Sequence, residues 1–166
     1  MQRVTVCLFL LLGTVGCSTF TPAPPPRTIE ENQLFGPVAM KLDTFSKIKD
    51  LTGTGKPDGI EALVEFDDRF GDRTKAAGTI FFELFLYRPG FPDPRGARLV
   101  NPWSSSLAEY GDQKAHWERA SGAYTFRLAC DQLAWDQNYV LTATFESGGG
   151  QRFFSQIVLK GSAGNQ

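Results

Sequence analysis

His116 is the single histidine of the chain, so any histidine-assisted nucleophile built from these residues must use it. Ser104, Ser105 and Ser106 precede it, and hydroxyl groups of this kind become nucleophiles only when a base removes their proton. None of the three lies in the Gly-x-Ser-x-Gly turn that positions such a serine in many hydrolases. A metal site with two histidines of this chain is also excluded. We therefore interpret His116 as a packed or surface imidazole and expect that the protein is not an enzyme.

Oxygen ligands of the kind that calcium prefers are concentrated in residues 50–61. The segment has acidic residues at its first, ninth and twelfth positions, Asp50, Asp58 and Glu61, and a glycine at its sixth. This spacing resembles the calcium loop of EF-hand proteins, in which the glycine permits a tight turn. The resemblance implies that these three carboxylates bind calcium. Thr52 and Thr54 replace two carboxylates of the family pattern, so an ordinary turn rich in Gly, Pro and Asp is the alternative.

The first residues of the chain have the features of a signal for export. Arg3 is followed by an apolar run at residues 4–12, and small residues at 13–16 precede Cys17. The run is too short to cross a bilayer as a mature helix, and a cationic start before such a run is typical of a secretory signal peptide. Small residues directly before a cysteine resemble the signal peptide of bacterial lipoproteins. The resemblance implies that residues 1–16 are removed and that Cys17 becomes the lipidated first residue.

Residues 18–36 are rich in proline and threonine and lack apolar periodicity. Because proline-rich chains favour an extended conformation, we expect residues 17–36 to be a lipidated cysteine followed by a tether. Ser18 rather than Asp follows Cys17, which resembles the outer-membrane sorting pattern of lipoproteins in bacteria with two membranes. We expect a protein of the cell envelope that is attached to the outer membrane through the lipid on Cys17.

Composition narrows the classes of partner. The 17 Lys and Arg residues are scattered and nearly balanced by 18 Asp and Glu residues, so nucleic acid is not an expected partner. Cys7 and Cys17 belong to the predicted signal, which leaves Cys130 as the single cysteine after it. An exported domain without a disulfide framework must fold on its apolar core. A bridge from Cys17 to Cys130 is an alternative only if Cys17 carries no lipid.

Alternation of apolar and polar residues dominates residues 37–161 and is typical of half-buried β-strands. The glycine-rich segment 147–150 predicts a turn of a closing hairpin. Segment 107–117 predicts a short turn of helix at most, because Gly111 interrupts its spacing. The strands expected from alternation are 60–67, 80–87, 124–129, 139–145 and 151–160, with a first strand or a broken pair in 38–51. This pattern predicts an all-β fold, a single antiparallel β-sandwich of six to eight strands, followed by a disordered tail at 162–166.

Leu133 and Tyr139 stand on either side of the turn before the strand at 139–145. With Leu141 next on the same face, they resemble the corner before the penultimate strand of immunoglobulin-like and fibronectin-III sandwiches. In those domains the tyrosine packs and bonds back to the preceding loop. The resemblance implies an immunoglobulin-like sandwich, and a strand that simply begins with tyrosine is the alternative.

The strand at 80–87 is apolar on both faces. Its even-numbered residues form one face, and the opposite face carries the aromatic residues Phe81, Phe85 and Tyr87. A strand of this kind needs cover on both faces. Cover is expected either from the proline-rich excursion 88–117, folded back over the sheet, or from a partner. The second alternative predicts Phe81, Phe85 and Tyr87 as partner-binding residues.

Two functional hypotheses follow from these observations. The first is a membrane-anchored, non-catalytic interaction or structural module that binds another envelope protein. In size, anchor and fold class it is similar to the small sandwich lipoproteins that anchor secretion machines, such as pilotins and the outer-membrane lipoprotein of type VI secretion. The second is a calcium- or ligand-binding sandwich that uses the loop at residues 50–61. No cofactor other than calcium is expected.

Overall fold

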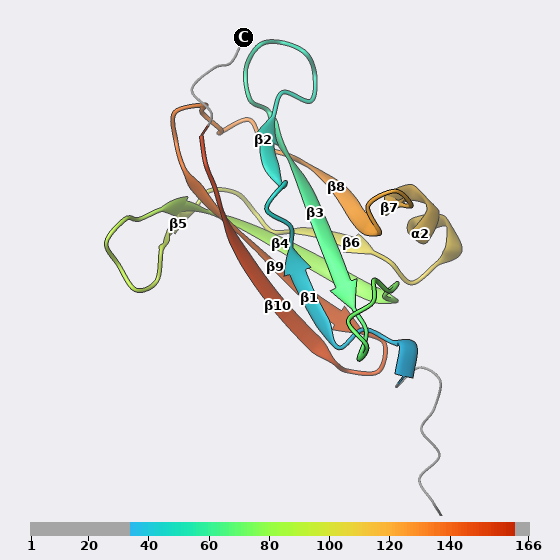
Figure 1. Ribbon diagram of the computed structural model, residues 1–166. Helices are drawn as coiled ribbons and strands as arrows, with labels where there is room; N and C mark the ends of the chain where they lie inside the picture. The colour runs from blue at the N-terminus through green and yellow to red at the C-terminus, as the bar shows by residue number, and fades with distance from the viewer. Residues whose placement is uncertain (1–33, 162–166) are drawn as a thin grey trace, which may run out of the picture.

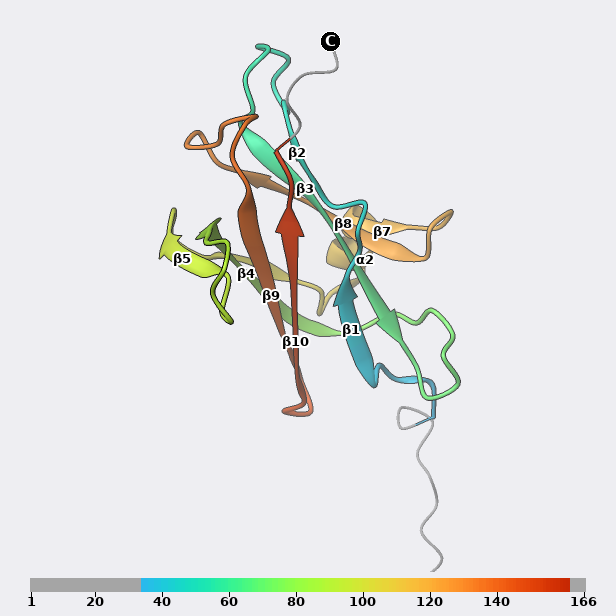
Figure 2. The ribbon, with the colours of Figure 1, turned by 60° about the vertical axis from the view of Figure 1, so that its left-hand side comes forward.

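A computed structural model describes residues 34–161 of the chain. The predicted signal peptide, Cys17, most of the tether and the tail lie outside the described residues. Within them the chain forms two antiparallel sheets of five strands each (Figures 1 and 2). The first sheet contains β1 (Ala39–Leu42), β2 (Lys47–Lys49), β3 (Gly59–Asp67), β7 (Trp117–Glu118) and β8 (Ala123–Ala129). The second contains β4 (Gly78–Tyr87), β5 (Arg95–Arg98), β6 (Trp103–Ser106), β9 (Tyr139–Ser147) and β10 (Arg152–Leu159).

The order of the strands defines the class of fold. The first sheet runs β1-β3-β8-β7, with β2 also paired to β3, and the second runs β10-β9-β4-β5, with β6 also paired to β4. In an immunoglobulin-like sandwich the corresponding orders are A-B-E-D and G-F-C. The chain follows both orders, so the predicted immunoglobulin-like sandwich is confirmed.

Every strand expected from alternation is present, and the excursion at residues 88–117 adds more, so the sandwich has ten strands instead of the six to eight expected. It contains the short strands β5, β6 and β7 and the seven-residue helix α2 (Tyr110–His116). The helix has about two turns, one more than expected. Gly111 lies in its first turn, where the carboxylate of Asp112 accepts a hydrogen bond from the backbone N–H of Glu109 at 3.3 Å. A glycine at this end weakens the helix less than one in its middle.

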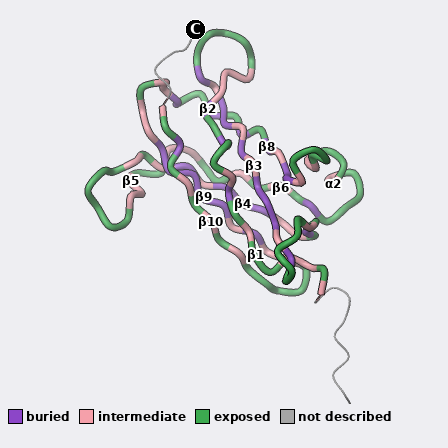
Figure 3. Tube along the Cα trace, viewed as in Figure 1, coloured by how far each residue is buried: buried purple, intermediate pink, exposed green. Residues whose placement is uncertain are grey.

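Aromatic side chains fill the space between the two sheets. Phe66 of β3 lies with its ring centroid 4.8 Å from that of Phe145 on β9 and 5.8 Å from that of Tyr124 on β8. The ring centroids of Phe82 on β4 and Phe126 on β8 also lie close together, 5.0 Å apart. All five side chains are buried, and buried positions follow the middle of the long strands in Figure 3. The core therefore joins the sheets by ring contacts made across the sandwich.

Tyr139 forms the predicted corner. Its hydroxyl accepts a hydrogen bond from the backbone N–H of Ala134 at 2.8 Å, and both Tyr139 and Leu133 are buried. Burial raises the pKa of the Tyr139 phenol. In the same turn, the indole N–H of Trp135 donates to the carbonyl of Gly55 at 3.2 Å. The corner thus ties the start of β9 to the loop between β2 and β3.

Replacement of Phe66 by alanine tests the core. The substitution removes ring contacts to both sheets and leaves a cavity, so we expect a loss of about 3–5 kcal/mol in the free energy of unfolding. Urea denaturation measures it. Phe45→Ala is the matched control, since Phe45 is 76% exposed and should change stability by no more than about 0.5 kcal/mol. Equal effects of the two substitutions would contradict this account of the core.

Candidate functional site

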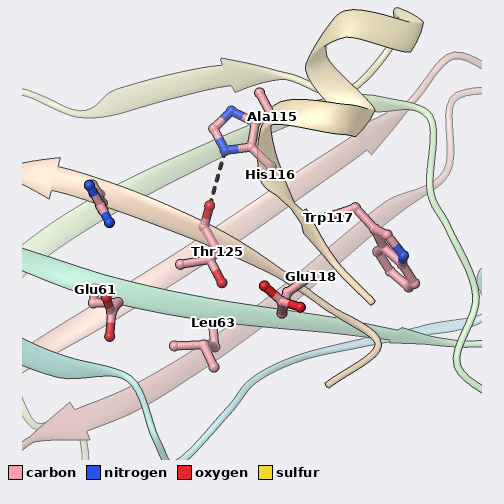
Figure 4. A pocket seen from close by; sticks show the side chains of 8 residues that line it. Glu61, Leu63, Ala115, His116, Trp117, Glu118 and Thr125 are labelled. Atoms are coloured by element: carbon pink, nitrogen blue, oxygen red, sulfur yellow. Dashed lines mark hydrogen bonds between the residues drawn. The ribbon is translucent and has the colours of Figure 1, made fainter. Parts of the chain in front are cut away.

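His116 bridges the two sheets. Its Nε2 lies 3.2 Å from the hydroxyl oxygen of Ser105 on β6. Its Nδ1 lies 3.0 Å from the backbone oxygen of Thr125 on β8, the contact drawn as a dashed line in Figure 4. A carbonyl oxygen only accepts, so Nδ1 carries a proton, and in the neutral ring Nε2 accepts from the Ser105 hydroxyl. The ring also stacks on Phe126, with 4.5 Å between centroids. This is the packed imidazole that the sequence predicts.

The hollow beside His116 is open to the outer face of the first sheet. Its volume is about 610 Å³, and its walls include Glu61 and Leu63 of β3 and Thr125 and Arg127 of β8 (Figure 4). Ser105 is not among the residues that line it. The only hydroxyl that His116 polarises in these contacts therefore does not face the hollow. The geometry gives His116 a role in joining β6 to β8, and the expectation that the protein is not an enzyme stays a prediction.

The carboxylates of Asp50 and Asp58 hold the backbone of their own loop. Asp50 accepts hydrogen bonds from the N–H groups of Gly53 at 2.7 Å, Thr54 at 3.1 Å and Gly55 at 2.6 Å. Asp58 accepts from the Thr52 hydroxyl and from the N–H of Leu51. These hydrogen bonds lower the pKa of both carboxyl groups. The bond from the Gly55 N–H has the largest effect on Asp50, and the bond from the Thr52 hydroxyl has the largest effect on Asp58. Both carboxylates thus hold the turn of their own loop.

Gly55 adopts the conformation expected of a calcium loop, whereas Glu61 is paired with a lysine. Gly55 has a φ of 83°, the left-handed conformation that the sixth position was expected to need. Glu61 lies on β3, where the ammonium group of Lys49 approaches within 2.6 Å and lowers the pKa of the carboxyl by a hydrogen bond. Among residues 34–161, no three His, Cys, Asp or Glu side chains are arranged to hold a metal ion. The spacing produces the tight turn, and the geometry does not favour the calcium site.

The predicted aromatic residues lie on the outer face of the second sheet. Ile80, Phe82 and Leu84 point into the core and are fully buried, so the alternating side chains Phe81, Phe85 and Tyr87 point outward, where all three are half-buried. On this face Phe81 pairs with Thr144 of β9 and Phe85 pairs with Val140. The aromatic side chains therefore belong to rows that continue onto neighbouring strands.

Two apolar residues of β10 complete these rows. Phe154 pairs with Thr144, and Val158 pairs with Val140, so one row reads Phe154, Thr144, Phe81 and the other Val158, Val140, Phe85. Phe154 is 55% exposed and Val158 is 37% exposed. We call this surface the aromatic face; it consists of Phe81, Phe85, Tyr87, Phe154 and Val158, and Val140 between Phe85 and Val158 is fully buried.

The excursion at residues 88–117 covers the aromatic face only in part, because its strands extend the second sheet in its own plane. Strand β5 pairs with the end of β4 at Phe85 and Tyr87, and β6 pairs with its beginning at residues 79–82. The excursion widens the sheet because β4 still has an unpaired edge after pairing with β9. It also supplies charge beside the face, since the guanidinium of Arg95 lies 5.8 Å from the centroid of the Phe85 ring.

Phe154 and Val158 were not predicted as site residues, yet the sequence carries a signal for them. The doublets Phe153–Phe154 and Ile157–Val158 place apolar side chains on both faces of one strand. The same signal identified Phe81, Phe85 and Tyr87. Phe153 and Ile157 pack against the core, while their neighbours point outward.

The site belongs to an immunoglobulin-like β-sandwich whose second sheet carries aromatic and aliphatic side chains on its outer face, with the polar row Glu83, Thr142 and Gln156 between them. Comparisons of the chain with protein-family models, curated proteins and solved structures each returned no match. Within residues 34–161, no helix has the length and apolar character needed to span a bilayer.

The loop between β2 and β3 predicts a specific response to pH. Because the folded pKa of Asp50 is lowered, its contribution is present above the usual Asp pKa of about 3.9 and is lost as the pH falls toward the folded value. Asp50→Ala should therefore lower the urea midpoint at pH 7 and leave a smaller difference from the unsubstituted protein at pH 3. A difference that does not shrink at low pH would contradict the role of the charged carboxylate.

Calcium titration tests the alternative hypothesis directly. Calcium needs six to eight oxygen ligands, and no three acidic side chains converge among the described residues, so we expect no heat of binding in calorimetry and no change in melting temperature up to millimolar calcium. The variant Asp50→Asn with Asp58→Asn is the control for non-specific effects. Binding by the unsubstituted protein that this variant abolishes would restore the calcium site.

Proposed function

We propose that the chain is a lipid-anchored envelope lipoprotein whose sandwich is a non-catalytic interaction module, and that its aromatic face binds a partner protein of the envelope. The observation that carries the proposal is the pair of rows on the outside of the second sheet that have an apolar side chain on β10 and an aromatic one on β4, Phe154 with Phe81 and Val158 with Phe85. Exposed apolar side chains gathered on one surface are typical of interaction sites, whereas single exposed ones are ordinary.

The composition of the face suits protein recognition. Aromatic side chains supply large contact areas and are enriched at the centres of interfaces, where a few residues provide most of the binding energy. Phe81 and Phe85 are half-buried and held by the sheet, so they would lose little side-chain freedom when a partner covers them. At the β5 side of the face, Arg98 contacts the carboxylate of Glu83 at 3.1 Å. Charged pairs at a margin like this one contribute to the choice of partner more than to affinity.

The anchor rests on the sequence before Leu34. Lipid attachment to Cys17 would hold the module at a membrane, and the sorting pattern at Ser18 supports the outer membrane. A protein kept at one surface meets a co-anchored partner at a raised effective concentration, so a modest interface suffices for binding.

Phe154→Ser tests the aromatic face. Phe154 is the most exposed aromatic ring of the face, and loss of such a ring from an interface weakens binding by about 2 kcal/mol, or roughly thirtyfold in Kd. We therefore expect that crosslinking in the native envelope, followed by mass spectrometry, captures a reproducible partner with the unsubstituted protein and much less of it with Phe154→Ser. Phe45→Ser is the matched control, because Phe45 is an exposed phenylalanine on the turn between β1 and β2.

The anchor has its own measurement in the same experiment. The mass of the N-terminal peptide should show acylated Cys17, and Cys17→Ser should release the protein from the membrane fraction. Equal capture by Phe154→Ser and the unsubstituted protein would overturn the aromatic face as the binding surface. An unmodified Cys17 would overturn the anchor, whatever the capture shows.

A further inference from the structure

The end of the sandwich where the described chain begins carries exposed aromatic rings. Phe35 is 60% exposed, Phe70 in the connection from β3 to β4 is 63% exposed, and their ring centroids lie 6.2 Å apart. The hydroxyl of Thr74 donates to the backbone oxygen of Phe35 at 2.7 Å and fixes the two segments together. Val38, also at this end, is 45% exposed. None of these residues belongs to the aromatic face.

Beside these side chains lies a positively charged hollow of about 690 Å³. Three segments form its walls: the start of the described chain, the connection from β3 to β4, and the glycine-rich turn between β9 and β10. Figures 1 and 2 show all three at the same end of the sandwich. The charged residues that line it are Arg69 and Lys75, and no acidic residue lines it.

The acidic residues near the hollow are engaged or lie outside its walls. Asp67 forms an ion pair with Arg73. The carboxylate of Asp68 accepts hydrogen bonds from the backbone N–H groups of Phe70 at 2.8 Å and Asp72 at 3.0 Å, and exposed Asp72 is not a lining residue. Arg69 and Lys75 form no ion pair among the described residues, and the Lys75 ammonium lies 5.1 Å from the centroid of the Trp117 ring. Two cations are therefore available to an anionic group.

The anchor predicted at Cys17 leads to this end. The chain from Cys17 to Leu34 has a maximum reach of roughly 60 Å when fully extended, and it enters the described structure next to Phe35. The opposite end of the sandwich, with the loop between β2 and β3, is separated from this one by the full length of β3. A bilayer that holds Cys17 therefore meets the Phe35 end most readily.

We propose that this tether end, defined as Phe35, Val38, Arg69, Phe70 and Lys75, contacts the bilayer that carries the anchor. Aromatic rings are favoured at the level of the lipid headgroups, where their edges and faces leave water while neighbouring polar groups stay hydrated. Arg69 and Lys75 bind a lipid phosphate in the hollow. The proposal rests on the proposed function in taking Cys17 as the anchor, and it adds an orientation: the sandwich stands on its tether end.

The test supplies the anchor artificially, so that it does not depend on lipidation in the cell. The chain from residue 17 on, with Cys17→Ser and an N-terminal hexahistidine, is held on vesicles by nickel-chelating lipid. Asp72→Cys is labelled with an environment-sensitive dye, and Asp136→Cys, an exposed aspartate before β9 at the opposite end, is the matched reporter. Cys130 is buried, and burial raises the pKa of its thiol, so the label reaches the introduced cysteine.

We expect a blue shift and quenching by brominated lipid chains at position 72, and neither at position 136. Phe35→Ser with Phe70→Ser should abolish both signals at position 72, and Arg69→Ser with Lys75→Ser should reduce them on vesicles with anionic lipid. Unchanged urea midpoints show that these variants remain folded. Inorganic phosphate at millimolar concentration should leave the signals intact, which separates a lipid headgroup from free phosphate as the occupant.

Equal signals at positions 72 and 136, or none at either, would overturn the proposal, because neither result describes a protein that stands on one end. Displacement by inorganic phosphate would also overturn it. These outcomes are distinct from failure of the proposed function, which would appear as an unmodified Cys17 or as capture insensitive to Phe154→Ser.

Discussion

Packing of aromatic rings across the sandwich is the interaction on which the rest of the structure depends. Cys130 is a free thiol within the described residues, so no cross-link in this part of the chain holds the sheets together. Phe66 and Phe145 supply the contact instead, and Tyr124 extends it: its hydroxyl lies 2.6 Å from the side-chain oxygen of Gln113 on α2 and accepts the N–H of Ala76 at 3.1 Å. The core thereby also fixes the helix and the start of β4.

The sequence predicted those parts of the fold that bury one face of a strand, because burial of one face requires alternation. The corner at Tyr139 was predictable for a similar reason, since a buried phenol must find a hydrogen-bond partner near its own loop. Strands β5 and β6 have no such pattern, because Arg95–Arg98 and Trp103–Ser106 become strands by pairing with the open edge of β4. Pairing of this kind depends on tertiary position, which single-sequence patterns do not contain.

The same contrast separates the two candidate sites. A strand apolar on both faces leaves one face to be covered, so Phe81, Phe85 and Tyr87 were identified from the sequence, and the doublets in β10 would have added Phe154. For the loop at residues 50–61, the sequence could not distinguish a calcium site from an ordinary turn. An acidic residue followed by glycine is needed both by a calcium loop and by a turn whose backbone N–H groups bind a carboxylate. The two differ in whether enough acidic side chains converge on one point, which the folded loop fixes, and within residues 34–161 no three His, Cys, Asp or Glu side chains do so.

The hairpin of β9 and β10 connects the two proposed surfaces. Its turn at Ser147, Gly148 and Gly149 forms one wall of the hollow at the tether end, and the strand that follows carries Phe154 and Val158 of the aromatic face. Because β9 has nine residues, or about 30 Å of strand, the face extends away from the tether end along the length of the hairpin. A sandwich that stands on its tether end would therefore present the aromatic face sideways, parallel to the bilayer normal. In that orientation the aromatic face would be available to a partner that projects from the same membrane. Because the hairpin belongs to both surfaces, contact of the tether end with the bilayer would set the orientation of the aromatic face.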